Sequence, residues 1–259
     1  NSDCSNHLWD STTNSENIWA NKEFDMRDKV LGVIGGMGPL ATDIFYKYVI
    51  ENTQAECDQD HIDMVILSHA SMLDRTRAIF EGKLDILFAE LKNDLGILER
   101  AGAEYAIIPC NTCHVLLEQI KQLSSIEIIN MIDETAGAVY EQFGKDTRVG
   151  IMATDGTVKM RMYHDAIIKY DMIPVELSDE MQKLNMDIIY NGVKSGNKIN
   201  IEDLHKIEAE LVKRKCSCAI LGCTELSVIK DQYGLSDFFV DPMEIVARKV
   251  IPLCGGKLK

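Results

Sequence analysis

The chain has 259 residues, of which 46% are hydrophobic and 26% charged, an ordinary composition for a globular protein with one large or two smaller domains. Its formal net charge of −14, with no block rich in lysine or arginine to offset it, argues against nucleic acid as a partner. No run of apolar residues is long enough to span a bilayer, so we expect no membrane partner.

The cysteine content predicts a reducing environment. Eight cysteines in a chain of this size do not form the dense, regular framework of a small secreted domain, and several lie inside apolar runs. We therefore expect reduced thiols and a cytoplasmic protein. Cys4, Cys57 and Cys254 are expected to be surface or packing residues.

Residues 1–28 differ in composition from the rest of the chain. They are rich in Asn, Ser and Thr and lack the apolar core of a signal peptide. A segment of this composition buries too little apolar surface to fold by itself, so we predict a flexible N-terminal extension.

From residue 29 onward, short β-branched apolar runs alternate with helical patterns, as in a parallel sheet covered by helices. Pro39 suits the first turn of a helix, and Gly102 suits the end of one. A new alternation begins at residue 147. Strands are expected over residues 29–36, 62–68, 104–109 and 126–132, and helices over residues 39–53, 84–102, 112–123 and 133–144.

Two pairs of motifs indicate an internal duplication. LGVIGGMGP and VGIMATDGT each fit a buried strand, a small-residue loop and a helix, and their glycines Gly38 and Gly156 lie 118 residues apart. YAIIPCNT and CAILGCTE match in the same way, with Cys110 and Cys223 113 residues apart. We predict an α/β protein of two similar parallel-sheet domains related by duplication, with the active site in the cleft between them. The predicted domains comprise residues 29–130 and 131–239.

Cys110 and Cys223 are the main catalytic candidates. Each follows a buried strand and starts a helix, where backbone N–H groups and the helix dipole favour a thiolate. A thiol with an ordinary pKa of about 8.5 needs only about 2 kcal/mol to ionise at pH 7. Two such thiols suit the inversion of a stereocentre, because a proton must leave one face and return to the other. The competing interpretation is two small buried core residues.

Other interpretations of these motifs are weaker. Cys110 and Cys113 have the C-x-x-C spacing of a redox pair, and Cys216 and Cys218 could add zinc ligands, but no second C-x-x-C or metal-type histidine spacing accompanies them. GGMGPLA fits a dinucleotide-binding loop, but the second strand ends in Ser68 where an acidic residue is expected. We therefore expect neither a metal nor a cofactor.

Candidate cations occupy matching positions in the two halves. Arg75, in a predicted loop, lies 37 residues after the glycine of the first loop, and Lys194, in a glycine-rich loop, lies 38 residues after its counterpart. A lone surface cation is usually a solvated charge. The matched positions favour carboxylate binding instead, with Arg75 offering a bidentate fork. His69 and His114 are expected to be structural histidines.

The motifs GGMGPLAT, DRT, PCNT, GVKSGN, GCTE and DPM resemble, in their order and spacing, the cofactor-independent aspartate/glutamate racemase family, and in particular its aspartate racemase branch. The resemblance runs from about residue 29 to the C-terminal helix. It implies an isomerase for a small dicarboxylic amino acid, aspartate first and glutamate second. It also implies a homodimer without pyridoxal phosphate or metal, and a helix over residues 240–259 that returns to the first domain.

The same resemblance implies roles for individual residues. Cys110 and Cys223 would be the two catalytic acid/bases on opposite faces of Cα. Arg75 and Lys194 would hold substrate carboxylates. The other implied substrate-binding residues are Met37, Gly38, Asn111, Thr112, Thr154, Thr157 and Thr224.

Two residues depart from the family pattern. Relatives often carry Ala where this chain has Cys113, so a second thiol lies beside Cys110 and could oxidise onto it. They often carry a hydroxyl residue where this chain has Asp155, whose charge would repel a dicarboxylate. A dicarboxylate-binding protein without catalysis, or a related cysteine-dependent isomerase or decarboxylase, would share much of this pattern.

Overall fold

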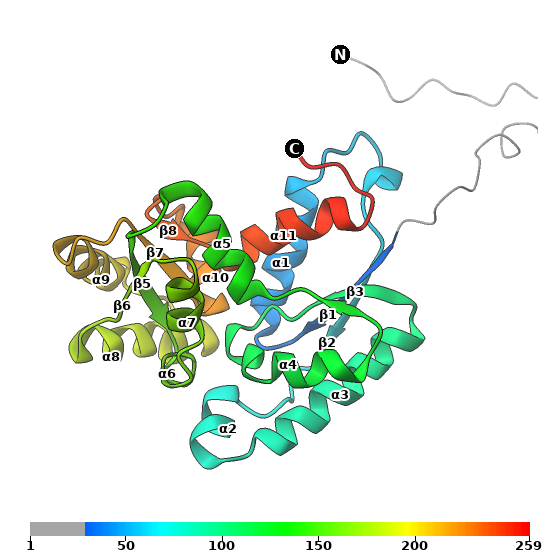
Figure 1. The fold of residues 1–259 in the computed structure, drawn as a ribbon, viewed down its shortest axis with the longest axis horizontal. Coiled ribbons are helices and arrows are strands. Elements are labelled where there is room, and N and C mark those ends of the chain that lie inside the picture. Colours follow the sequence, from blue (N-terminus) through cyan, green and yellow to red (C-terminus); the bar gives the residue numbers. More distant parts are fainter. Residues whose placement is uncertain (1–28) are drawn as a thin grey trace, which may run out of the picture.

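The computed structural model describes residues 29–259, so the predicted extension over residues 1–28, with Cys4, lies outside the described residues. The described chain forms two lobes, each built on a four-stranded parallel sheet with helices around it (Figure 1). The strand orders are β2-β1-β3-β4 and β6-β5-β7-β8. The two orders are the same when each half is counted from its own first strand, which confirms the predicted fold class.

The first sheet has β1 at its centre, paired with β2 and β3, and β4 at one edge. Its strands are β1 (Val30–Gly35), β2 (Met64–Ser68), β3 (Ala103–Ile107) and β4 (Glu127–Ile128). The helical segments of this half are α1 (Pro39–Asn52), η1 (Asp58–Asp60), α2 (Arg75–Glu81), α3 (Leu84–Arg100), η2 (Asn111–Leu116), α4 (Leu117–Ile120), η3 (Lys121–Leu123) and α5 (Met131–Phe143).

The second sheet repeats this arrangement with β5 and β7 at its centre. Its strands are β5 (Arg148–Ala153), β6 (Ile173–Val175), β7 (Cys218–Gly222) and β8 (Phe239–Val240). Its helical segments are α6 (Asp155–Lys159), α7 (Met162–Lys169), α8 (Asp179–Asp187), the π-helical η4 (Ile188–Lys194), α9 (Ile201–Lys213), α10 (Thr224–Tyr233) and α11 (Pro242–Leu253).

Alternate side chains of the central strands enter different cores. Leu31 and Val33 of β1 pack with residues of α1 and α11, whereas Ile34 packs with residues of α3 and η2. In the second sheet, Ile151 and Met152 of β5 likewise enter two separate clusters. Side chains alternate across a strand, so a sheet covered on both faces requires continuous apolar runs, as these strands have.

A glycine at the same place in each half lets a helix approach its central strand closely. A Cβ atom on Gly32 would lie 2.7 Å from Leu98 Cδ1 of α3, and one on Gly150 would lie 2.7 Å from Leu211 Cδ1 of α9. Gly32 and Gly150 are 118 residues apart, the same offset as the two glycine loops. The duplication therefore extends to side-chain packing.

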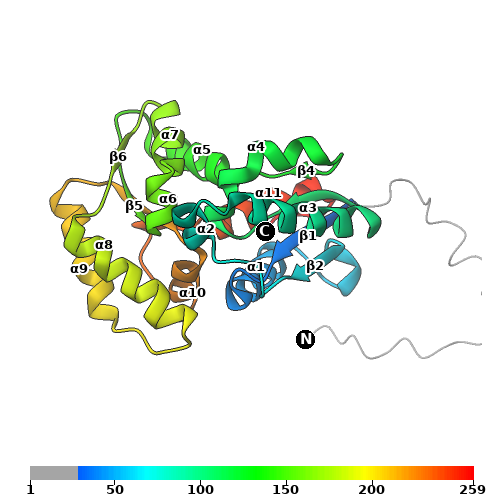
Figure 2. The same ribbon diagram turned by 90° about the horizontal axis from the view of Figure 1, so that it is seen from below.

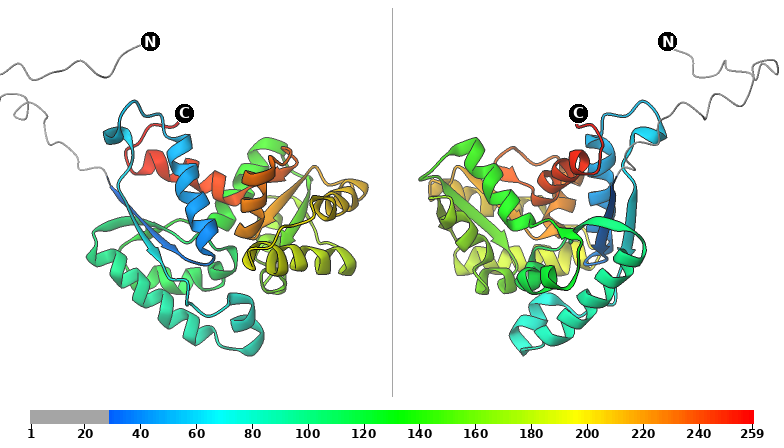
Figure 3. Two further views of the ribbon diagram at one scale, coloured as in Figure 1. Left: turned by 180° about the vertical axis from the view of Figure 1, so that it is seen from behind. Right: turned by 45° about the vertical axis from the view of Figure 1, so that its right-hand side comes forward.

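The two lobes meet through helices from both halves. Seen from below, α2 of the first half lies beside α6 of the second (Figure 2). Helix α11 lies against α1 of the first half and also contacts α5 (Figure 3). We propose that residues 29–130 with 240–259 form one domain and residues 131–239 the other, because α5 packs in the core of the second sheet and α11 in the core of the first. None of the helices between residues 29 and 259 combines the length and apolar character needed to cross a bilayer.

Two predicted elements after β3 were wrong. The helix expected over residues 112–123 consists mainly of the short 3₁₀ segments η2 and η3, with a single α-helical turn between them. The strand expected over residues 126–132 ends at Ile128. It ends there because the Asn130 side chain accepts hydrogen bonds from the next backbone N–H groups and so begins α5.

Replacing Gly150 by valine should destabilise the protein by about 1–3 kcal/mol, because the new side chain would collide with Leu211 in a packed core. Urea denaturation measures the change. Gly96→Ala is the matched control: its added Cβ would meet only Arg100 Nη1, at 3.5 Å, and it should stabilise α3 by about 0.5–1 kcal/mol. Equal stabilities for Gly150→Val and the wild type would contradict the close approach.

Candidate active site

A cavity of about 10 Å³ lies beyond the carboxyl ends of β3 and β7, and both candidate cysteines line it. Cys110 comes three residues after the end of β3, and Cys223 follows β7 directly. The other predicted site residues on its wall are Met37, Arg75, Asn111, Thr112, Thr154, Lys194 and Thr224. Loops at the carboxyl ends of parallel strands share one edge of each sheet, which explains why they converge here. The cavity has room for about one water molecule.

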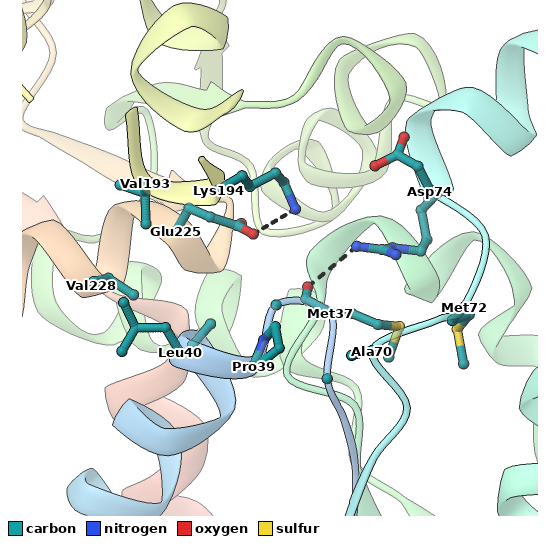
Figure 4. Close-up of a pocket in the computed structure, with 14 residues that line it drawn as sticks. Met37, Pro39, Leu40, Ala70, Met72, Asp74, Val193, Lys194, Glu225 and Val228 are labelled. Atoms are coloured by element: carbon teal, nitrogen blue, oxygen red, sulfur yellow. Dashed lines mark hydrogen bonds and ion pairs between the residues drawn. The ribbon is translucent and has the colours of Figure 1, made fainter. Parts of the chain in front are cut away.

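A larger cavity of about 330 Å³ adjoins the first (Figure 4). The two share Met37, Asp74, Arg75, Lys194 and Glu225. The remaining wall comes from the glycine loop and from apolar side chains, and its residues are Gly36, Gly38, Pro39, Leu40, Ala41, Ala70, Met72, Val193 and Val228. The predicted site residue Gly38 therefore lines the larger cavity and not the smaller one.

Cys110 is a buried thiol with a lowered pKa. It stands at the N-terminus of η2, and 5% of its surface is exposed. A hydrogen bond with the Cys113 side chain lowers the pKa of Cys110 most, burial opposes this effect, and the charges of Arg75 and Lys194 lower the pKa further, to about 6. Cys110 is therefore mainly a thiolate at pH 7.

Cys223 has the opposite character. Its Sγ atom donates a hydrogen bond to Glu225 Oε2 at 2.8 Å. Burial and the negative charge of Glu225 raise the pKa of Cys223 well above its ordinary value, and the charge of Lys194 only partly offsets them. The surroundings of the two thiols therefore shift their pKa values in opposite directions.

Lys194 forms an ion pair with Glu225, with 2.6 Å between Nζ and Oε1 (Figure 4). It is the last residue of η4 and not part of a glycine-rich loop, so its predicted location was wrong. Burial alone would lower the pKa of Lys194, but the charge of Glu225 raises it overall. A carboxylate ligand would have to share Lys194 with Glu225.

Arg75 is the first residue of α2, so the predicted loop was also wrong here. The helix begins at this point because the Asp74 side chain accepts a hydrogen bond from Arg77 N at 2.9 Å. The Arg75 side chain donates to the backbone oxygens of Leu73 and Met37, at 3.3 and 3.4 Å. These contacts hold the guanidinium group, which is 8% exposed, at the cavity wall.

Two buried donors at the cavity lack a partner among residues 29–259: Arg75 Nε and Asn111 Nδ2. Tyr163 donates a hydrogen bond to Asn111 Oδ1 at 2.5 Å, which fixes the amide and leaves Nδ2 available. An unpaired buried donor is costly, and such groups usually have a functional explanation. Carboxylate oxygens of a ligand would satisfy both donors.

Three threonine hydroxyls form a cluster behind the cysteines. Thr112 Oγ1 lies 2.9 Å from Thr157 Oγ1 and 3.3 Å from Thr154 Oγ1, and the last two are 3.1 Å apart. Thr112 and Thr154 line the small cavity, whereas Thr157 is on the wall of neither cavity. Thr157 therefore holds the hydroxyls of Thr112 and Thr154 in position through these hydrogen bonds.

The two histidines are structural in this arrangement. His114 Nε2 accepts a hydrogen bond from Met131 N at 3.2 Å, so Nδ1 carries the hydrogen and donates to Cys110 O at 3.0 Å. Burial lowers the pKa of His114 to about 4, which keeps the ring neutral. His69 Nδ1 instead pairs with Asp94 Oδ2 at 2.8 Å.

Asp155 does not reach the site. Its carboxylate accepts a hydrogen bond from Gln182 Nε2 at 2.7 Å and lines a separate surface depression. Because Asp155 lines neither of the two cavities, the structure does not support the expected repulsion between its carboxylate and a dicarboxylate substrate. Within residues 29–259, no three His, Cys, Asp or Glu side chains gather in a group that could hold a metal ion.

Four residues on the wall of the small cavity were not predicted from the sequence: Asp74, Thr76, Tyr190 and Glu225. Asp74 and Glu225 belong to the motifs DRT and GCTE. Each is a charged residue close in sequence to a predicted site residue, and this proximity could have identified them. Tyr190 offers no such signal. Its hydroxyl lies 3.3 Å from Asp74 Oδ2 and links η4 to the first half.

Comparison with known proteins agrees with this arrangement. The model of the Asp/Glu/Hydantoin racemase family matches residues 34–250. The aspartate racemase of Picrophilus torridus is 29% identical, covers 89% of this chain and 96% of its own, and superposes with a TM-score of 0.78. An aspartate racemase homologue from Pyrococcus horikoshii OT3 is 26% identical, covers 88% and 100% of the two chains, and has a TM-score of 0.70. The broad specificity amino-acid racemase RacX of Bacillus subtilis is 24% identical over 228 residues, which is 86% of this chain and 96% of the relative.

A duplicated α/β fold with two thiols at the meeting edges defines the class of protein as an amino-acid racemase, an isomerase. The chain belongs to the Asp/Glu/Hydantoin racemase family.

At pH 7, iodoacetamide should modify Cys110 before Cys223, because the thiolate is the nucleophile. Labelling of Cys110 should slow below about pH 6, where its thiolate takes up a proton, while Cys223 should stay slow up to pH 8. Tandem mass spectrometry of the tryptic peptides 101–121 and 216–230 measures both rates, because fragment ions separate Cys110 from Cys113 and Cys223 from Cys216 and Cys218. The exposed Cys57 reports on reagent activity. Faster labelling of Cys223 would contradict this assignment.

Proposed function

We propose that this protein interconverts L- and D-aspartate, with glutamate as a second substrate, by moving the Cα proton between Cys110 and Cys223 without a cofactor. The observation that carries the proposal is a single cavity lined by two thiols, one from each half of the chain. Their surroundings lower the pKa of one thiol and raise that of the other. The similarity to the aspartate racemase of Picrophilus torridus and to the aspartate racemase homologue of Pyrococcus horikoshii supports aspartate as the first substrate to test.

The proton moves in two steps. The Cys110 thiolate removes the Cα proton, and the electron pair of the broken C–H bond stays on the substrate as a carbanion. The Cys223 thiol then delivers its proton to the opposite face of Cα. Afterwards Cys110 is a thiol and Cys223 a thiolate, which is the state that accepts the other enantiomer. The resting protein therefore takes first the enantiomer whose Cα–H bond points at Cys110.

The carbanion is the high-energy intermediate of this reaction, and its negative charge spreads into the α-carboxylate. Donors fixed in advance in a site with little water stabilise such charge more than water does. The unpaired Arg75 Nε and Asn111 Nδ2 groups are suited to this task. Their burial means that no solvent needs to reorganise around them during the reaction.

The rest of an acidic substrate would meet charges of both signs. Lys194 is the second cation of the site and would hold the distal carboxylate, in competition with Glu225. The carboxylates of Asp74 and Glu225 already bond to Arg77 N and to Lys194, but both line the cavities and would also meet the substrate ammonium group. A substrate would enter through the larger cavity, and the small cavity would widen as the lobes separate. A homodimer and a cytoplasmic location stay predictions of the sequence.

Incubation of L- or D-aspartate with the pure protein in heavy water should place deuterium on Cα and produce the opposite enantiomer, without added pyridoxal phosphate. Proton NMR and chiral chromatography measure the two outcomes. Cys110→Ser and Cys223→Ser should each lower racemisation by about 10²–10⁴-fold, because each removes one acid/base. Cys57→Ser, at an exposed site, should remain active. Ligand-dependent thermal stabilisation without any turnover would instead identify a dicarboxylate-binding protein.

Arg75→Lys should lower kcat/KM for aspartate by about 10–100-fold, because a single ammonium group cannot reproduce the fork of a buried guanidinium. Steady-state kinetics with each enantiomer measure the loss. Arg77→Lys is the matched control on the same helix: its side chain is 62% exposed and pairs with Glu81, so kinetics should not change. An unaffected Arg75→Lys variant would remove Arg75 from substrate binding.

A further inference from the structure

Cys110 and Cys113 stand on one tight turn. The backbone N–H of Cys113 donates to Cys110 O at 3.2 Å, and the Cys113 side chain is near enough to lower the pKa of Cys110. A turn closed from residue i to residue i+3 brings its end Cα atoms within about 7 Å, the range in which a disulfide can form. The thiols therefore need little backbone movement to bond.

The two thiols differ in exposure and in pKa, so an oxidant should react with one before the other. Cys110 lines the cavity and carries the charge, so a small oxidant meets it first. Cys113 is fully buried, with its Sγ atom 3.3 Å from Met37 Sδ, and burial raises the pKa of its thiol. Cys113 is thus shielded from solution but stands on the same tight turn as the reactive thiol.

We propose that Cys110 and Cys113 form a reversible, peroxide-sensitive modification site in which Cys113 resolves the oxidised catalytic thiol. The Cys110 thiolate, with one proton, reduces hydrogen peroxide to water and becomes a sulfenic acid. The Cys113 thiol then attacks that sulfur, an S–S bond forms, and the hydroxyl leaves as a second water. Two thiols lose two electrons, and the peroxide gains them.

Cys113 is better placed for this step than Cys223. Cys223 lies across the cavity, and its thiol already donates to Glu225. The remaining described cysteines are on the surface, as Cys57 is, or do not line the small cavity. The disulfide would stop racemisation, because it removes one of the two acid/bases. An added thiol could restore the enzyme by attacking the Cys110 sulfur from the cavity.

The test treats the full chain with hydrogen peroxide and digests it with trypsin under non-reducing conditions. The peptide 101–121, which contains both cysteines, should become lighter by two hydrogen atoms. Dithiothreitol should restore the peptide mass and most of the racemase activity. In Cys113→Ala, the same peptide should instead gain oxygen atoms as sulfinic or sulfonic acid, and dithiothreitol should recover little activity.

Each protein is compared with its own untreated sample, so a lower starting rate in the variant does not affect the result. Cys113→Ser, closer to cysteine in volume, repeats the test if the alanine variant folds poorly, and Cys57→Ala is the control. Cross-linking of peptide 101–121 to peptide 216–230, or equal recovery of the wild type and both Cys113 variants, would overturn the proposal. The activity readout rests on the proposed function, but the peptide masses do not, so failure of one is distinguishable from failure of the other.

Discussion

A buried negative charge must be balanced close by, and the site between the two lobes is organised around one such charge, the thiolate of Cys110. The Cys113 side chain lowers its pKa most, Arg75 and Lys194 lower it further from two different halves of the chain, and Glu225 in turn balances Lys194. Charges interact more strongly inside a protein than in water, so each of these groups constrains the positions of the others. The cavity is small because these groups meet across it.

The duplication supplies two equivalent thiols, and their local neighbours make them different. Both cysteines follow a central strand and precede a helix. Cys110 is followed three positions later by a thiol that can donate to it, whereas Cys223 is followed two positions later by a carboxylate that accepts from it. The proposed proton transfer between opposite faces requires one acid and one base at any moment, and this difference would provide them within one repeated fold.

The Cys113 thiol, which lowers the pKa of Cys110, also affects the proposed oxidation of Cys110. A neighbouring thiol that donates a hydrogen bond to a thiolate is in position to attack the same sulfur once it is oxidised. If both proposals hold, a thiolate kept for proton abstraction would also react with peroxide, and the buried Cys113 would be its resolving partner.

The sequence by itself determined the alternation of strands and helices, the duplication and the two cysteines, because apolar periodicity and motif spacing are local properties of the chain. It also singled out Arg75 and Lys194, although both end up on helical segments instead of loops. Only the tertiary structure decided that Glu225 and Tyr190 reach the cavity while Asp155 faces away from it. The direction of a side chain depends on helix phase and on packing between segments far apart in the chain, and a single sequence does not contain those distances.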